Sequence, residues 1–228
     1  MKSIMEDCLR RFLDKGDRMT YEHSLRVGHL ARIVAAHVSG WTEEEKEAFV
    51  AGCCIHDIGK RMIPLEILHK PTVLTSEEWR SMRRHPEIGM RLLHINGYMH
   101  PPVADIVQYH HERWDGLGYP HGLKGSEIPE WARVCSVIDA FDTMVSNRPY
   151  RRGLSVEQAK EELRRQSGTQ FDPDAVELFL NVPFESFRAA TEFCETYPFP
   201  GSSRWKRNLE TNVHEAQMNA TAWRRSGQ

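Results

Sequence analysis

Apolar residues recur every three to four positions along most of the chain, which is the spacing of helices that bury one face. Leu25, Leu30 and Val34 form such a stripe, with Thr20 as a candidate N-cap before it and Gly40 as a candidate end after it. A short amphipathic segment covers residues 4–12. Further helices are predicted to begin near Thr42, Thr75, Val103, Trp131, Ser155 and Asp172.

Two capping boxes support these helix starts. Thr42 with Glu45, and Thr75 with Glu78, pair a hydroxyl with a carboxylate three residues later, which satisfies the free amides of a first turn. Pro86 either kinks the helix that starts at Thr75 or begins the next one. No run of alternating apolar and polar residues is long enough to build a sheet. The sequence therefore predicts an all-α fold, a helical bundle.

Glycine and proline divide the chain into segments. The stretch 113–129 contains four glycines and two prolines, which is typical of a loop and not of a long helix. From Pro198 the sequence becomes polar. We predict an N-terminal helix within residues 1–19, a main domain over 20–197, and a polar tail over 198–228 that is either helical or disordered.

Composition narrows the classes of function. The formal net charge is -2 and 40% of the 228 residues are hydrophobic. The chain has no block of basic residues that would predict a nucleic acid polymer as its partner. A few local cations could still hold a small anion. No segment has the length of a membrane span or the apolar core of a signal peptide, and the five cysteines suit a reducing compartment. We expect a cytoplasmic protein in which Cys53 and Cys54 are buried apolar side chains.

An ionisable pair, His56 and Asp57, ends the apolar run FVAGCCI. Burying such a pair costs free energy unless a partner compensates for lost hydration. Imidazole nitrogen and carboxylate oxygen together suit iron, manganese or zinc. A helix end with a dipole-stabilised histidine and a hydrogen-bonded aspartate explains the pair equally well.

Further histidines and aspartates favour the metal interpretation. Individually each has an ordinary explanation: His85 could cap a helix, and Asp142 could pair with Arg148. These histidines and aspartates lie on separate predicted helices, however, and a shared metal site would explain all of them at once. The additional candidates are His23, His85, His110, His111, Asp139 and Asp142.

The motifs resemble those of the HD-GYP domain family, a branch of the HD metal-dependent phosphohydrolases. The likeness covers roughly residues 20–182. The matching segments are HSLRV at 23–27, HDIGK at 56–60, IPLEILHKP at 63–71, LTSEEWRSMRRHPEIG at 74–89, HHERWDGLGYPHGLKGSEIP at 110–129, IDAFDTMVSNRPYR at 138–151 and GTQFDP at 168–173.

The resemblance implies an HD-domain-like bundle with a glycine-rich GYP loop beside a metal centre. Its reaction would be hydrolysis of cyclic di-GMP to linear pGpG by a metal-activated water, with a second cut to GMP left open. The metals would commonly be iron or manganese. The implied ligands are His23, His56, Asp57 and Asp139 for one metal, and Asp57, His85, His110 and His111 for the other, with Asp57 bridging.

Other residues take implied roles beside the metals. Asp57 and Lys60 would be catalytic, and Lys60, Arg148 and Arg151 would contact phosphate oxygens. Tyr119 would form an aromatic wall for a flat base.

One position departs from the family pattern. Three-metal members of the family carry an acidic residue one helical turn before the first histidine, where this chain has Met19. A thioether is a poor ligand for hard iron or manganese ions. We therefore expect two metals and not three.

Three other functions remain open at this point. The chain could be a phosphohydrolase of another nucleotide, or a diiron oxygenase. It could also be a non-catalytic module that binds cyclic di-GMP and signals through a protein partner or as a homodimer.

Overall fold

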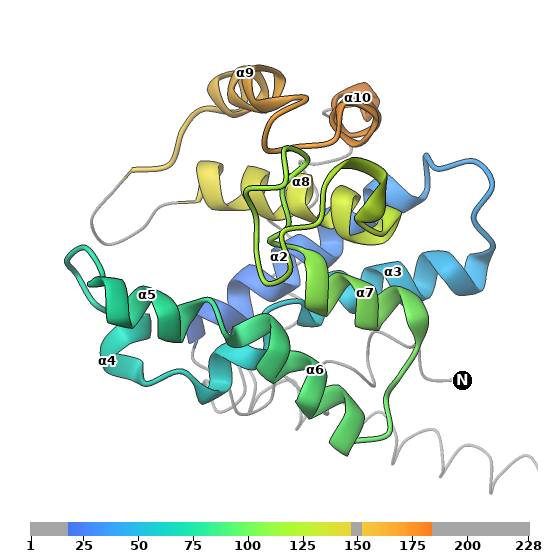
Figure 1. Ribbon diagram of the computed structural model, residues 1–228. Coiled ribbons are helices and arrows are strands. Elements are labelled where there is room, and N and C mark those ends of the chain that lie inside the picture. Colours follow the sequence, from blue (N-terminus) through green and yellow to red (C-terminus); the bar gives the residue numbers. More distant parts are fainter. Residues whose placement is uncertain (1–17, 147–151, 184–228) are drawn as a thin grey trace, which may run out of the picture.

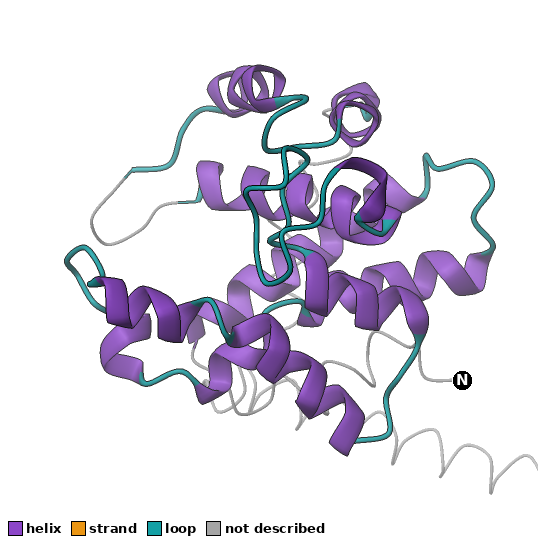
Figure 2. Ribbon diagram, in the orientation of Figure 1, coloured by secondary structure: helices purple, strands orange, loops and turns teal. Residues whose placement is uncertain are grey.

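The computed structural model describes residues 18–146 and 152–183, and in these ranges it contains helices and no strand (Figure 2). The all-α prediction is confirmed. A single bridge between Ser167 and Phe171 is the isolated β contact of this part of the chain. The helices are α2 (Arg18–Ala35), α3 (Glu43–Ile55), η2 (Ile58–Met62), α4 (Leu65–Leu68), α5 (Ser76–Met82), α6 (His85–Ile95), α7 (Pro101–Tyr109), η3 (Gly125–Glu127), α8 (Glu130–Val145), α9 (Val156–Gln166) and α10 (Pro173–Asn181).

Side-chain capping marks where α3, α5, α9 and α10 begin. Both predicted capping boxes are confirmed, at Thr42 before α3 and at Thr75 before α5. Pro86 does not kink a helix, because α5 has already ended and Pro86 lies in the first turn of α6. The prediction for Thr20 was wrong. This residue lies inside α2, which includes Arg18 and ends five residues before Gly40.

The core forms where α2, α3, α7 and α8 pack together (Figure 1). Helix α3 lies against both α2 and α7, and α8 contacts α2 and α7 from another side. Helices α9 and α10 pack on α8, and α6 packs on α7 and η2. Cys53 and Cys54 are buried free thiols, as predicted. Helices α2 and α7 therefore each contact both α3 and α8.

Two glycines allow the closest approaches between elements. A Cβ atom on Gly28 would lie 2.0 Å from the Sγ atom of Cys54, so α2 and α3 can pack this tightly only without a side chain there. A Cβ atom on Gly59 would lie 1.9 Å from the carbonyl oxygen of His85. This second contact brings the segment after His56 and Asp57 directly against the start of α6.

Several predictions fall on residues outside the described ranges. These are the short amphipathic segment at residues 4–12, the tail over 198–228, and the phosphate contacts of Arg148 and Arg151. The last two residues of the predicted segment 1–19 belong to α2. The domain boundaries also stay predictions. Among the described helices, none combines the length and the apolar character needed to cross a membrane.

Candidate metal centre

The seven predicted ligand side chains converge where the ends of α3 and α7 meet α2, α6 and α8. They form two groups, and within each group one possible ligand atom per residue lies within 4.8 Å of all the others. Most of these side chains are buried, whereas Asp139 and His111 are partly exposed. The first group is His23, His56 and Asp139, and the second is Asp57, His85, His110 and His111.

Asp57 belongs to the second group, and it turns one carboxylate oxygen toward the histidines of each group. Its Oδ2 atom is 3.2 Å from Nε2 of His56 and 3.8 Å from Nε2 of His23. Its Oδ1 atom is 3.3 Å from Nε2 of His85 and 3.7 Å from Nε2 of His110. One buried carboxylate is thus in reach of both histidine groups.

Hydrogen bonds on the far side of each ring determine which nitrogen faces the centre. His56, His85 and His110 place Nδ1 at 2.8, 2.8 and 3.0 Å from backbone carbonyl oxygens. A carbonyl can only accept, so Nδ1 donates and Nε2 of the neutral ring presents a lone pair.

The resulting arrangement fits a cation. Nε2 of His85 lies 3.3 Å from Nε2 of His110, so two lone pairs face each other across the second group. Asp57 Oδ1 is buried and has no hydrogen-bond partner. Converging lone pairs and an unpartnered carboxylate oxygen are the donor set of a transition-metal site.

Burial and mutual charge set the protonation of the cluster. Burial lowers the pKa of His85 to about 3. Burial, together with His110 and His85, holds the pKa of His111 well below its usual value. Burial alone would raise the pKa of Asp57, but Lys60 and His56 hold it well below its usual value. Neutral imidazoles and an ionised carboxylate are the forms that bind metal.

His56 experiences the opposite balance. Burial would lower its pKa, but the carboxylates of Asp57 and Asp139 outweigh burial and raise it to about 10. The negative field that holds a proton here is the same field that would favour a metal ion.

His23 is oriented by residues that the sequence interpretation did not connect. Its Nδ1 atom donates to Asp142 Oδ2 at 2.8 Å, and its Nε2 atom lies 3.0 Å from Asp139 Oδ1. Arg26 forms two hydrogen bonds to the Asp142 carboxylate, at 2.7 and 2.9 Å. Asp142 therefore stands behind His23 as an orienting partner, and Asp139 faces the centre. The assignment of Asp139 as a metal ligand stays a prediction.

The glycine-rich loop is organised by Glu112, which the sequence interpretation missed. This side chain is buried and accepts hydrogen bonds from the backbone amides of His121, Gly122 and Leu123, at 2.7, 3.2 and 3.0 Å. The loop turns back onto the residues that follow the two histidines. An acidic residue placed between two histidines and a glycine-rich loop was the available signal.

Tyr119 projects from this loop toward the centre, where its ring contacts the side chains of His111 and Arg83. Its ring centroid is 4.7 Å from that of His111, with an angle of 31° between the planes. The guanidinium carbon of Arg83 lies 5.2 Å from the same ring centroid. Lys60 donates to Asp57 Oδ2 at 2.5 Å, beside the first group.

Replacing Glu112 by alanine should destabilise the loop and the fold. Three part-buried amides would lose their acceptor, and we expect the free energy of unfolding to fall by about 3 kcal/mol, since each hydrogen bond contributes roughly 1 kcal/mol. Urea denaturation measures this. Glu127→Ala is the matched control, because Glu127 accepts from Lys124 at an exposed site of the same loop. Equal losses in the two variants would contradict the role of Glu112.

Comparison with known proteins agrees with this geometry. Residues 7–175 match the family model described as HD domain. A cyclic di-GMP phosphodiesterase of Thermotoga maritima is 42% identical over 170 residues, which is 74% of this chain and 46% of that protein. A 3′3′-cGAMP-specific phosphodiesterase of Vibrio cholerae is 38% identical over 173 residues, covering 75% of this chain and 33% of that protein.

A solved HDG"Y"P protein from Bdellovibrio bacteriovorus has the same fold. It superimposes with a TM-score of 0.57 over 73% of this chain and 53% of that chain, at 18% identity. The chain thus spans about half or less of the length of these relatives. With the family match, the HDIGK and GYP motifs and the helical fold that surrounds them, the chain belongs to the HD domain family, in its HD-GYP branch.

Proposed function

We propose that this chain hydrolyses cyclic di-GMP to linear pGpG at a centre that holds two metal ions. The observation that carries the proposal is the position of Asp57, whose two carboxylate oxygens face two separate groups of histidines. A cyclic di-GMP phosphodiesterase among the relatives supports the choice of substrate.

Each residue of the site has a role in this proposal. One ion would be held by His23, His56 and Asp139 and the other by His85, His110 and His111, with Asp57 in reach of both groups. When bound, iron or manganese ions supply Lewis-acid activation of water and neutralise charge on the phosphate. Lys60 places an ammonium group beside Asp57 and adds positive charge where a phosphate oxygen would lie. Arg148 and Arg151 are proposed as further phosphate contacts on sequence grounds.

The reaction is a phosphodiester hydrolysis. The oxygen of a water molecule forms a bond to phosphorus, and the bond from phosphorus to the 3′ oxygen of one ribose breaks. The attacking water loses a proton, and the released 3′ oxygen takes one up. The ring opens to a linear dinucleotide with a 5′ phosphate, so water is the co-substrate and no oxidant is required.

A 3′3′-cGAMP phosphodiesterase is the second candidate. It is favoured by the Vibrio cholerae relative of that name, at 38% identity. The bonds broken are of the same kind, so the two functions differ in the bases that the site accepts.

The test is an assay of the purified chain, loaded anaerobically with iron or manganese, against a panel of nucleotides. We expect cyclic di-GMP to yield pGpG, and a chelator to abolish turnover until metal is restored, because the metal supplies the activated water. Cleavage of 3′3′-cGAMP with cyclic di-GMP intact would establish the second candidate.

Three other outcomes would reject both candidates. Turnover of a different nucleotide alone would identify another phosphohydrolase. Binding of cyclic di-GMP without turnover in either metal form would indicate a signalling module. Oxygen consumption without phosphodiester cleavage would favour an oxygenase.

A further inference from the structure

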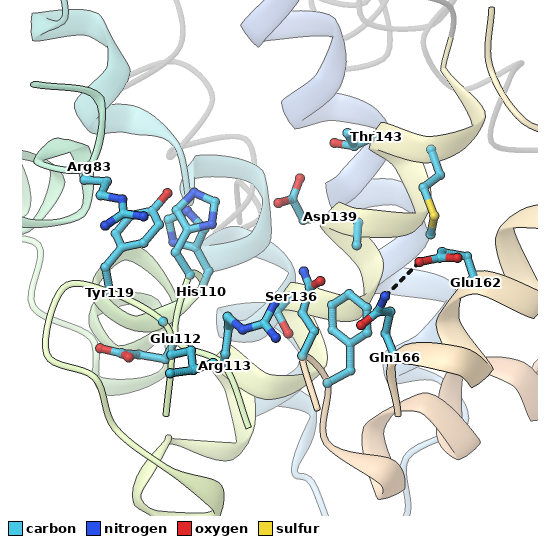
Figure 3. Close-up of a pocket in the computed structure, with 17 residues that line it drawn as sticks. Arg83, His110, Glu112, Arg113, Tyr119, Ser136, Asp139, Thr143, Glu162 and Gln166 are labelled. Atoms are coloured by element: carbon cyan, nitrogen blue, oxygen red, sulfur yellow. Dashed lines mark hydrogen bonds between the residues drawn. The ribbon is translucent and has the colours of Figure 1, made fainter. Parts of the chain in front are cut away.

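Two cavities adjoin the proposed metal centre and share part of their lining. The larger, of about 590 Å³, extends from Arg83 and Tyr119 past Asp139 to Gln166 (Figure 3). The other, of about 340 Å³, extends toward Lys60. His111, Asp139 and Thr143 line both cavities. A ligand that is bound at the centre can therefore extend into either one.

Four lysine and arginine side chains of the described residues line these cavities, and three of them have carboxylate partners. Lys60 pairs with Asp57, Arg26 with Asp142, and Arg113 with Asp115. Arg83 lines the larger cavity and is exposed. In the part of the chain that the structure describes, its charged group contacts the Tyr119 ring and no carboxylate.

Arg83 has a defined place relative to the centre. The Tyr119 ring lies 4.7 Å from the ring of His111, and the guanidinium carbon of Arg83 lies 5.2 Å from the Tyr119 ring. Tyr119 thus contacts both the guanidinium group and a proposed metal ligand. Contact with an aromatic ring orients the guanidinium plane but uses none of its five N–H donors in hydrogen bonds.

We propose that Arg83 binds the phosphate of the cyclic dinucleotide that is not hydrolysed. This inference rests on the proposed function. The substrate carries two phosphates, and the one that is attacked lies at the metals. The negative charge of the second phosphate requires a cationic side chain at some distance from the metal ions. This side chain should line the same cavity and should not already be paired with a carboxylate. Arg83 meets these conditions, and its planar fork matches phosphate oxygens.

The test compares Arg83→Gln and Arg83→Lys with Arg84→Gln. Arg84 is the adjacent exposed arginine and lines neither cavity, so it controls for the loss of one charge. For Arg83→Gln we expect KM for cyclic di-GMP to rise about ten- to a hundredfold, with kcat changed by less than about twofold. Arg83→Lys should recover part of this loss, and Arg84→Gln should match the parent protein.

Two further measurements separate a phosphate contact from other roles. The salt dependence of KM should weaken in Arg83→Gln, because one ionic contact with the ligand is gone. Metal content should stay at the parent level. Reduced metal content or a fall in kcat would instead mean that Arg83 only positions Tyr119, and would overturn the proposal.

Ligand choice provides the last distinction. The loss should be the same for cyclic di-GMP, 3′3′-cGAMP and cyclic di-AMP, measured by calorimetric binding to the metal-loaded protein. A loss that increases with the number of guanines would assign Arg83 to a base and overturn the phosphate contact.

If no dinucleotide is cleaved but binding still weakens equally in Arg83→Gln, the proposed function fails and the Arg83 contact stands. Equal KM and binding in Arg83→Gln and Arg84→Gln would overturn the contact while the hydrolase stands, and absence of all binding would overturn both.

Discussion

Asp57→Asn should lose most of the bound metal and reduce kcat/KM for the cyclic dinucleotide by more than about a hundredfold. The hydrogen-bond partners of metal ligands alone affect metal affinity or activity by about 10–100-fold, and Asp57 is placed to serve both ions directly. An amide removes the negative charge that both histidine groups share, and its nitrogen cannot act as the second acceptor. Metal-to-protein ratios and a product assay measure the two effects.

Asp105→Asn is the matched control for this variant. Asp105 lies on α7, belongs to neither ligand group, and undergoes the same chemical change. Its metal content and activity should equal those of the parent protein. Full metal content in Asp57→Asn would exclude the shared carboxylate and, with it, the proposed two-metal centre.

Gly59→Ala should lower the free energy of unfolding by about 3 kcal/mol, at the upper end of the usual cost of overpacking. The added Cβ would meet the carbonyl oxygen of His85 at 1.9 Å and the amide nitrogen of Gly89 at 2.7 Å. These are backbone atoms, so η2 and α6 must separate. His85 begins α6 and would move away from His110 and Asp57, which should weaken metal binding in the second group.

Gly97→Ala provides the comparison for packing. Nothing lies within 4 Å of a Cβ at Gly97, and its φ of +66° adds only a backbone cost of about 1–2 kcal/mol for a left-handed residue. Thermal unfolding and metal titration of both variants separate crowding from backbone strain. If Gly59→Ala is no less stable than Gly97→Ala and retains its metal, the close contact between η2 and α6 is not a constraint on the site.

Local chemistry made the helices predictable, and its limits explain the errors. The capping boxes at Thr42 and Thr75 depend on residues three positions apart, so the sequence alone specifies them. Thr20 is also a threonine but lies within α2, because the helix already includes Arg18. A hydroxyl can cap a helix only where the residues before it are not helical. The suggested pairing of Asp142 with Arg148 stays a prediction, because Arg148 lies outside the described residues. Within them, Arg26, which is 116 residues from Asp142 in the sequence, donates to this carboxylate.

The sequence by itself determined the helical class, the family and the set of histidines and aspartates that gather at one place. Helical periodicity and contiguous motifs are properties of short segments, so they can be recognised in the sequence without knowledge of how the helices pack. Only the tertiary structure decided that Asp57 turns one oxygen to each histidine group, that Glu112 holds the loop, and that Arg83 lies over Tyr119. These relations depend on how helices pack and which rotamers fit between them, and no spacing along the chain encodes the direction of a side chain.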